Sequence, residues 1–253
     1  MSRNVNSELC RALIQRLSEL ESERARVLRH LSHELKTPLA ALREGISLLQ
    51  DGVAGPLTTP QQEVVSILAN NTRLLQQQIA ELLDYHATVL DASRLQLRHV
   101  DLRGLVDSVV EAQRLQLQTQ SQQVRVECSA GAVLLDPDKM RVALGNLLSN
   151  AIAFTPPGGE IVFHISRGAS VGKPGSERLF IDCIDSGPGV AEADAAKIFD
   201  PFVQGRRRPA SGAGGSGVGL SIVREVAMIH GGQVSLVTCA QGAHFRMELP
   251  YEE

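Results

Sequence analysis

The 253-residue sequence is poor in aromatic residues: Trp is absent, and Phe, Tyr and Trp together make up 3% of the chain. A surface that stacks nucleic-acid bases depends on aromatic side chains. Attraction to nucleic-acid phosphates depends on positive charge, whereas the formal net charge of this chain is −3. We therefore expect no nucleic acid among its partners.

Long apolar runs are also missing. No run of 18 apolar residues occurs, so no segment of this sequence is expected to span a membrane. The first residues, MSRNVNSELC, lack the apolar core of a signal peptide. Four scattered cysteines with neither CxxC spacing nor a disulfide framework favour reduced thiols (Cys10, Cys128, Cys183, Cys239). We expect a cytoplasmic chain, either as a soluble protein or as the cytoplasmic portion of a membrane protein.

Residues 8–95 are expected to be helical nearly throughout. In the first part of this region, successive apolar residues are spaced alternately three and four positions apart, as in a coiled coil. Near residue 33 three successive spacings are four positions each. Such a phase shift locally unwinds a coiled coil. The turn DGVAGPLTTPQQ (51–62) separates two helices, with Thr59 predicted to cap the second and Pro60 at its first position. The first seam comprises Cys10, Leu13, Leu17, Leu20, Arg24, Val27, Leu31, Leu35, Leu39, Leu42, Ile46 and Leu49.

The second predicted helix carries a similar apolar stripe. Two such helices form a hairpin whose stripe cannot be buried by the hairpin alone. Pairing of two copies into a four-helix bundle solves this problem, so we expect a homodimer. The stripe comprises Val64, Ile67, Leu68, Leu74, Leu75, Ile79, Leu82 and Leu83.

After about residue 95, short β-branched runs alternate with helical stretches at 101–118, 137–154 and 217–230. The last two runs are joined by a short connection and are expected to form a hairpin. The sequence predicts an α+β domain with a largely antiparallel sheet and helices on one face, after a linker near Asp91 to Val100. The strand-like runs are VRVEC, AVLLD, EIVFHIS, LFIDCID, QVSLV and HFRMELP.

His33 stands out in the first predicted helix, within LRHLSHELKTPLAAL (28–42). It lies two residues from both Leu31 and Leu35, which is roughly 200° of helical rotation from each. The imidazole is therefore expected to face solvent rather than the apolar seam. A neutral imidazole is a competent nucleophile near physiological pH.

The residues around His33 carry a motif. Lys36 and Thr37 share its helix face, and Pro38 removes one backbone hydrogen bond and favours a bend. SHELKTPL resembles the phosphoacceptor box of sensor histidine kinases. By this resemblance His33 accepts the phosphoryl group and Glu34 activates it. Thr37 would place the water when the kinase acts in reverse as a phosphatase.

A second motif lies in the predicted helix that begins with Asp136 as N-cap and Pro137 in the first turn. Asn146 and Asn150 are four residues apart and share one face. They are either ordinary surface amides or ligands, because amide oxygens suit a hard divalent cation. NLLSNAIAFTP resembles the Asn box of the same family, in which the position of Asn150 binds Mg²⁺ and that of Asn146 lies near the phosphates. Ala153 departs from the family, which usually carries Lys, Arg or His there.

IDCIDSGPGV predicts a strand that ends at Asp185, followed by a turn on Gly187 and Gly189. A carboxylate at this place can accept a hydrogen bond from an exocyclic amine such as adenine N6, and glycines let backbone approach a ring closely. By itself the pattern is equally a plain turn. KIFDPF places Phe199 and Phe202 around a proline, either as a core-anchored loop or, by the resemblance, at the border of an ATP lid.

GGSGVGLSIV puts Gly215, Gly217 and Gly219 directly before a predicted helix, whose N-terminal amides attract phosphate. The run lacks the Lys-Ser/Thr of a P-loop, and Leu220 occupies the place of the third Rossmann glycine. The three arginines at 206–208 are either a solvated run or, through one of them, a partner of the terminal phosphate.

Together these motifs resemble the catalytic domain of histidine kinases, an α/β sandwich shared with the DNA gyrase B, Hsp90 and MutL ATPases. The resemblance implies ATP and Mg²⁺ as cofactors, with the metal at Asn150. It implies a nucleotide site formed by Asn146, Asn150, Asp185, Gly187, Gly189, Phe199, Phe202, Gly215, Gly217, Gly219 and Leu220.

The expected organisation is the end of a signal-transmitting coiled coil (1–24), a dimerisation and phosphotransfer hairpin (25–92) and an ATP-binding domain (97–253). The expected activity is ATP-dependent autophosphorylation of His33 and phosphoryl transfer to an aspartate of a response regulator receiver domain, with reverse phosphatase activity. Membrane contact is expected only through a sensory part that is not in this chain. A non-kinase ATPase and a binding-only scaffold with a decayed site stay open as alternatives.

Overall fold

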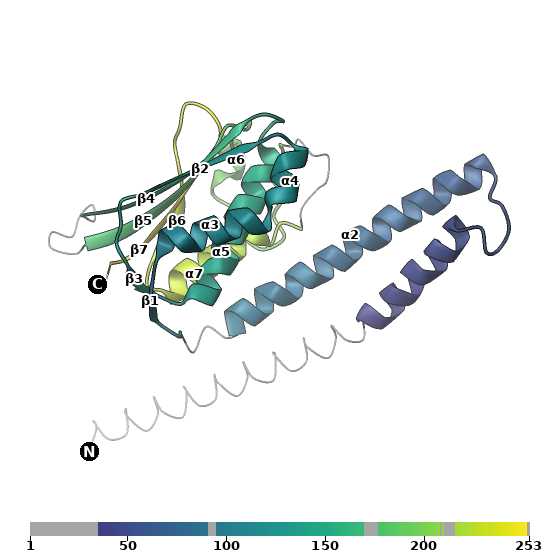
Figure 1. The fold of residues 1–253 in the computed structure, drawn as a ribbon, viewed down its shortest axis with the longest axis horizontal. Coiled ribbons are helices and arrows are strands. Elements are labelled where there is room, and N and C mark those ends of the chain that lie inside the picture. The colour runs from purple at the N-terminus through teal and green to yellow at the C-terminus, as the bar shows by residue number, and fades with distance from the viewer. Residues whose placement is uncertain (1–34, 91–94, 170–176, 208, 210–215, 252–253) are drawn as a thin grey trace, which may run out of the picture. The chain divides into compact units, whose positions relative to one another are not determined.

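The structure is a computed structural model that describes residues 35–90, 95–169, 177–207, 209 and 216–251, with the side chains of 77, 78 and 80–90 left out. The chain divides into two compact units, Met1–Leu90 and Asp91–Glu253 (Figure 1). Among the described residues, no helix is long and apolar enough to cross a membrane.

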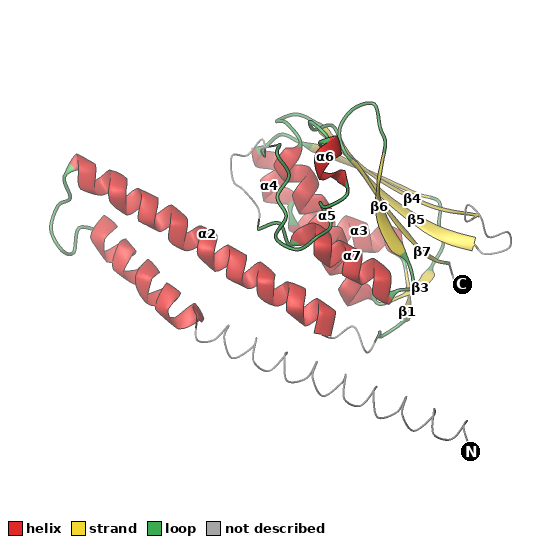
Figure 2. Cartoon of the chain, turned by 180° about the vertical axis from the view of Figure 1, so that it is seen from behind, coloured by secondary structure: helices red, strands yellow, loops and turns green. Residues whose placement is uncertain are grey.

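The first unit is a helical hairpin. A helix over residues 35–50 and the long helix α2 (Thr59–Leu90) lie side by side in both views, joined by the turn 51–58 (Figures 1 and 2). The first helix continues through Pro38 without interruption from residue 35 onwards. The predicted unwinding near residue 33 lies outside the described residues.

The cap of α2 differs from the predicted one. Thr58, not Thr59, precedes the helix, and Gln61 Oε1 accepts hydrogen bonds from both the Thr58 N–H (2.8 Å) and its hydroxyl (2.9 Å). Gln61 thus supplies the reciprocal half of a capping box. Thr59 is the first helical residue because the bond from Gln62 N reaches back to the carbonyl of Thr58 (2.9 Å).

Few apolar side chains of the hairpin are buried within one chain. Leu39, Ile46 and Val65 are buried. The sequence pattern did not assign Val65 to the stripe. Most of the predicted stripe is exposed instead, together with further large apolar side chains of the hairpin: Leu35, Leu42, Leu48, Val53, Val64, Ile67, Leu68, Leu74 and Leu75.

The second unit has a five-stranded sheet in the order β2-β4-β5-β7-β6, with β2 parallel to β4 and every other pair antiparallel. A separate two-stranded sheet pairs β1 with β3. The strands are β1 (Arg98–Val100), β2 (Gln123–Cys128), β3 (Val133–Leu135), β4 (Glu160–Ala169), β5 (Glu177–Asp185), β6 (Gln233–Val237) and β7 (His244–Pro250).

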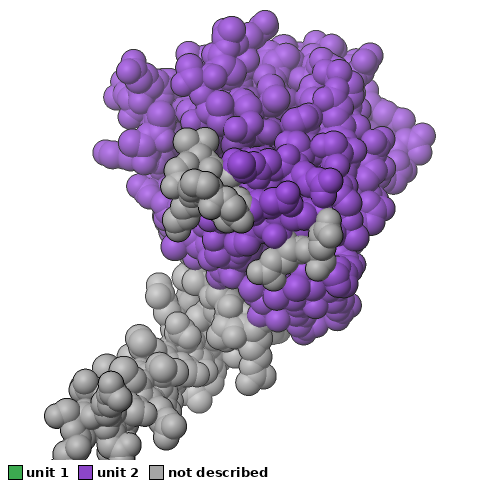
Figure 3. All heavy atoms as spheres, turned by 90° about the vertical axis from the view of Figure 1, so that its left-hand side faces the viewer, with its two compact units in different colours: residues 1–90 green, residues 91–253 purple. Residues whose placement is uncertain are grey.

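Helices cover one face of this sheet in both ribbon views (Figures 1 and 2), and the space-filling view shows the unit as one continuous body (Figure 3). Alternate residues of the strands and the apolar faces of the helices form the core. The predicted α+β architecture is confirmed. The helices are α3 (Leu102–Ala112), α4 (Arg114–Thr119), α5 (Pro137–Phe154), α6 (Glu192–Ala195) and α7 (Gly219–Ile229).

Two details correct the sequence prediction, and a third confirms it. Residues 98–100 were assigned to the linker but form β1, which is paired with β3. The helix predicted over 101–118 is two helices, because α3 ends and α4 begins at Gln113. The predicted cap of α5 is confirmed: Asp136 accepts hydrogen bonds from the backbone N–H groups of Asp138 and Lys139, and Pro137 occupies the first turn.

Candidate functional site

Of the expected phosphoacceptor residues, the structure describes Thr37, whereas His33 and Glu34 lie outside the described residues. Lys36 and Thr37 are exposed on the first helix and Leu39 is buried, as the sequence pattern predicts. The roles of His33, Glu34 and Thr37 stay predictions.

Asp185 ends β5 on the face of the sheet that the helices cover, and it is 4% exposed. Its Oδ1 accepts two backbone hydrogen bonds, from Gly187 N (2.8 Å) and from Ala243 N (3.1 Å). Burial raises the pKa of this carboxyl, and the two hydrogen bonds oppose that rise. The N–H groups fix the orientation of the carboxyl group, and no partner is found for Oδ2 among the described residues.

The turn after Asp185 requires glycine where two backbone segments meet. Gly189 has φ +76°, and a Cβ there would lie 2.5 Å from the carbonyl oxygen of Gly242. A side chain on Gly187 would come within 2.7 Å of the carbonyl oxygen of Phe154, at the end of α5. The turn is therefore held between the end of α5 and the segment before β7.

Asn146 and Asn150 lie half-buried on α5. The Asn146 amide donates to the carbonyl of Val142 (2.9 Å), and its Oδ1 lies 2.8 Å from the place that a Cβ of Gly219 would occupy. The structure therefore brings the Asn box and the glycine box together, although more than 70 residues separate them in the sequence. Ala153, also half-buried, brings no charge to this helix.

The two phenylalanines of KIFDPF play different parts. Phe199 packs edge-to-face on Phe245 of β7, with ring centroids 6.2 Å apart, and so anchors the loop to the sheet. Phe202 is exposed and has φ +64°, a left-handed conformation that is rare for an aromatic residue. Its N–H donates to the carbonyl of Gly217 (3.0 Å), which links the Phe box to the glycine box.

The N-terminus of α7 has no side-chain cap. Val218 occupies the cap position and has no side-chain oxygen, so the first amides of the helix, including those of Gly219 and Leu220, are suited to an anion. Gly217 precedes them with φ +77°. Gly215 lies outside the described residues.

The arginines between these boxes differ in their contacts. The backbone N–H of Arg206 donates to Asp194 Oδ2 (2.8 Å), and its guanidinium lies 3.7 Å from the same carboxylate. The guanidinium of Arg207 lies 3.6 Å from where a Cβ of Gly189 would be. Arg208 lies outside the described residues.

Sequence reasoning missed two contributors. The amide of Ala243 holds Asp185 from a segment 58 residues away, and no residue type signals a backbone donor. Gln122 is buried, and its amide donates to the carbonyls of Ile152 (3.1 Å) and Thr155 (2.7 Å). Gln122 therefore fixes the end of α5 against which Gly187 packs.

Family models match both units. Residues 23–87 match the model of the "His Kinase A (phospho-acceptor) domain". Residues 135–253 match the model described as "Histidine kinase-, DNA gyrase B-, and HSP90-like ATPase". The helical hairpin and the sheet domain thus correspond to a phosphoacceptor domain followed by a kinase-type ATPase domain.

Relatives and solved structures share this arrangement. The chain is 42% identical over 239 residues to the sensor histidine kinase GlrK of Escherichia coli (strain K12), covering 94% of this chain and 49% of that protein. It is 34% identical to the sensor protein CreC of the same organism, covering 84% of this chain and 42% of that protein. The chain therefore spans about half the length of these relatives.

Among solved structures, full-length ShkA in complex with AMPPNP aligns with a TM-score of 0.65 at 30% identity, over 88% of this chain and 45% of that one. The histidine kinase AdeS of Acinetobacter baumannii shares the fold, with a TM-score of 0.59 at 20% identity, over 87% of this chain and 98% of that one. The chain belongs to the sensor histidine kinases of two-component systems.

Proposed function

We propose that the second unit binds ATP and that His33 receives its γ-phosphoryl group. The observation that carries this proposal is the fixed carboxylate of Asp185: Oδ1 is held by two backbone N–H groups, which leaves Oδ2 to accept a hydrogen bond from adenine N6. The uncapped amides of α7 are suited to the phosphates.

In the proposed reaction, an imidazole nitrogen of His33 attacks the γ-phosphorus. The bond between that phosphorus and the β,γ-bridging oxygen breaks, ADP leaves, and the imidazole proton passes to Glu34. The phosphoryl group then moves to an aspartate of a response regulator receiver domain. Positioning and charge neutralisation supply most of the catalysis in such transfers.

Mg²⁺ belongs to the same proposal. Among the described residues, no group of three or more His, Cys, Asp or Glu side chains could hold a metal ion. The half-buried amide of Asn150 fits a hard cation through its oxygen, provided the nucleotide phosphates supply most other ligands. The metal would neutralise phosphate charge. Of the three arginines at 206–208, Arg207 has its guanidinium beside Gly189 of the turn after Asp185.

The proposed organisation is a coiled-coil end (1–24), a dimerisation and phosphotransfer hairpin (25–92) and the ATP-binding domain (97–253).

The exposed apolar side chains of the hairpin support a homodimer, because a monomer would leave them in water. Thr37 is proposed to place a water for phosphatase activity. The cytoplasmic location, as the kinase portion of a membrane sensor, is part of the same proposal.

Incubation with γ-labelled ATP tests the function. We expect a label that is lost in acid and stable in base, and that is absent from His33→Gln although this variant still binds ATP. Phosphate release without any labelled protein would favour a non-kinase ATPase. Failure of the unaltered chain to bind ATP would favour a binding-only scaffold.

A further inference from the structure

The face of the sheet that no described helix covers carries a buried carboxylate. Asp182 of β5 is 1% exposed. Side chains alternate along a strand, and Ile181, Cys183 and Asp185 are all buried toward the helices. Asp182 therefore points to the opposite side of the sheet from Asp185, three residues earlier in the same strand.

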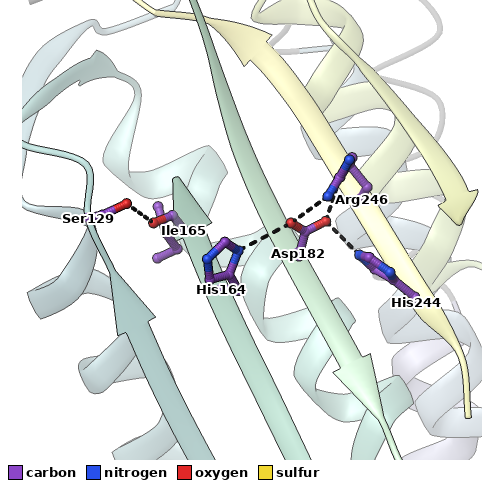
Figure 4. Close-up of polar contacts among 6 residues, drawn as sticks. All are labelled: Ser129, His164, Ile165, Asp182, His244 and Arg246. Carbon is purple, nitrogen blue, oxygen red and sulfur yellow. Dashed lines mark hydrogen bonds and ion pairs between the residues drawn. The ribbon is translucent and has the colours of Figure 1, made fainter. Parts of the chain in front are cut away.

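Three side chains from the neighbouring strands enclose this carboxylate (Figure 4). Arg246 of β7 lies directly opposite in the register and forms a two-pronged pair, with Nε 2.7 Å from Oδ1 and a terminal nitrogen 3.0 Å from Oδ2. His244 Nε2, also on β7, lies 2.7 Å from Oδ1. His164 of β4 lies directly opposite on the other side, with Nδ1 3.6 Å from Oδ2.

The enclosure holds a charge. Burial acts to raise the pKa of Asp182, but the hydrogen bonds from Arg246 and His244 outweigh it, so the pKa lies below its ordinary value. The same bond raises the pKa of Arg246. An ionised, buried carboxylate keeps its partners in place, because a partner that moves away leaves an uncompensated charge.

One of these partners is next to the nucleotide site. His244 is the first residue of β7 and directly follows Ala243, whose N–H donates to Asp185 Oδ1. The carbonyl of Ala243 also accepts the N–H of Asp185 (3.0 Å). Ala243 is therefore hydrogen-bonded to Asp185 through its backbone. The next residue, His244, is hydrogen-bonded to Asp182 through its side chain, on the opposite face of the sheet.

The segment before Ala243 is irregular, and the carbonyl of its last residue, Gly242, accepts the Cys239 thiol (3.2 Å). Residues 238–242 form no helix or strand, and Gly242 packs so closely on the backbone of Asp185 that a Cβ would overlap it. The bond between His244 and Asp182 is thus the first side-chain anchor of β7 after an irregular segment. A shift of His244 along the strand would carry the amide of Ala243 with it.

We propose that Asp182 and His244 are positioning residues for adenine recognition: their bond on the open face of the sheet fixes the amide of Ala243, which aims Asp185 Oδ2 at the exocyclic amine. The inference rests on the proposed function. It assigns a role to Asp182 and His244, two residues to which the sequence motifs give none.

The test compares ATP with purine riboside triphosphate, which lacks the exocyclic amine, by calorimetry on the full chain. His244→Leu removes the bond and keeps side-chain bulk. The preference for ATP is the ratio of the affinity for ATP to the affinity for purine riboside triphosphate. We expect this ratio to fall about tenfold in His244→Leu, the effect of one lost hydrogen bond. The affinity for purine riboside triphosphate should change less than about twofold. Loss of stability alone would weaken both nucleotides equally.

His164→Leu is the matched control, because His164 contacts the same carboxylate from β4, a strand without a bond to the Asp185 side chain. Its ATP preference should stay unchanged. His244→Gln should restore most of the preference, since its amide can reach Asp182. Should His244→Leu fail to fold, His244→Asn, which is polar but too short to reach Asp182, carries the same expectation.

The outcomes separate the inference from the proposed function. Asp185→Asn should abolish the preference for ATP. If it does and both His244 variants keep the preference, or if the His164 and His244 variants lose it equally, the positioning role is wrong and the adenine contact stands. If Asp185→Asn keeps the preference, the adenine contact is wrong, and the inference is overturned with it.

Discussion

The helical hairpin and the sheet domain treat their apolar side chains in opposite ways. In the sheet domain the largest ones, such as Phe163, Met140 and Leu144, are fully buried between the sheet and its helices. In the hairpin most large apolar side chains with a described position stay exposed; Ile67, for instance, is 59% exposed. The sheet domain has a core of its own, whereas the hairpin needs a further surface.

The polar groups show the same contrast. In the sheet domain the carboxylate proposed to bind adenine is held by backbone hydrogen bonds, which Asp185 accepts from Gly187 and Ala243. In the hairpin the side chains of Lys36 and Thr37 are exposed on a helix. This difference agrees with the proposed function, in which the sheet domain binds a small ligand and the hairpin offers its surface to other domains.

The largest expected effect is on association of the hairpin. Ile67→Lys should raise the dimer dissociation constant at least about 100-fold, because burial of an isoleucine is worth about 1.5–3 kcal/mol and both copies lose it. Sedimentation measures this constant. Val53→Lys is the control: Val53 is 70% exposed in the turn, and its variant should dimerise normally. Unchanged association of Ile67→Lys would mean that the exposed stripe is not the interface.

The core of the sheet domain gives the next largest effect. Leu144 on α5 is fully buried, so Leu144→Ala should lower the free energy of unfolding by about 3 kcal/mol through lost burial and a cavity. Urea unfolding measures it. The exposed Val53→Ala should change stability by less than about 0.5 kcal/mol. A cost below about 1 kcal/mol at Leu144 would contradict a closely packed core.

The cap of α2 offers a smaller effect. Thr58→Ala should destabilise the hairpin by about 0.5–1 kcal/mol, because the residue before the helix loses the hydroxyl that donates to Gln61 Oε1. Thermal unfolding followed by circular dichroism measures this change. Thr59→Ala should cost nothing, since Thr59 is already helical. The reverse ranking would favour the cap that the sequence predicts.

The stability of the sheet domain should depend on pH through the buried His230. His230 Nε2 accepts the N–H of Asp136 (3.1 Å) and Nδ1 lies 2.7 Å from the carbonyl of Val226, so the buried ring is neutral. Burial lowers the pKa of His230 below its ordinary 6.5. The unfolded chain therefore binds a proton first as pH falls below 6.5, and the sheet domain loses stability from there until the pH reaches the lower folded pKa.

Denaturant unfolding of the parent chain and of His230→Gln, from pH 7.5 to 5, measures this dependence. The variant should be less stable at neutral pH and should show a flatter dependence on pH. His99→Gln, at an exposed position on β1, should keep the parent's slope. Equal slopes for the parent and His230→Gln would show that another group titrates in this range.

Much of the fold followed from local chemistry in the sequence. The cap at Asp136 with Pro137 depends on residues within one turn, so it was predictable. The pairing of β1 with β3 was not, because strands of three residues show no period. The apolar stripe of the second helix was expected to include Val64, but Val64 is exposed and its neighbour Val65 is buried. The side chains that pack between the two helices of one hairpin are therefore not those on the face that the stripe presents.

The candidate site divides in the same manner. Asp185 and the glycines could be identified because close approach and a strand-end carboxylate depend on residue type. The amide of Ala243 and the enclosure of Asp182 could not, since both depend on which strands become neighbours. Residue types therefore suffice to predict candidate nucleotide contacts, whereas the groups that hold those candidates in place become visible only in the structure.

In the proposed function the sheet domain supplies a phosphoryl group to one imidazole of the hairpin, that of His33. Mass spectrometric mapping of the chain after incubation with ATP and Mg²⁺, under alkaline conditions that preserve phosphohistidine, detects this transfer. We expect a single phosphoryl group on the peptide that contains His33, and a smaller phosphorylated fraction of that peptide in Asp185→Asn at the same subsaturating ATP concentration. A phosphoryl group on any other residue, or none at all while ATP is bound, would contradict the account.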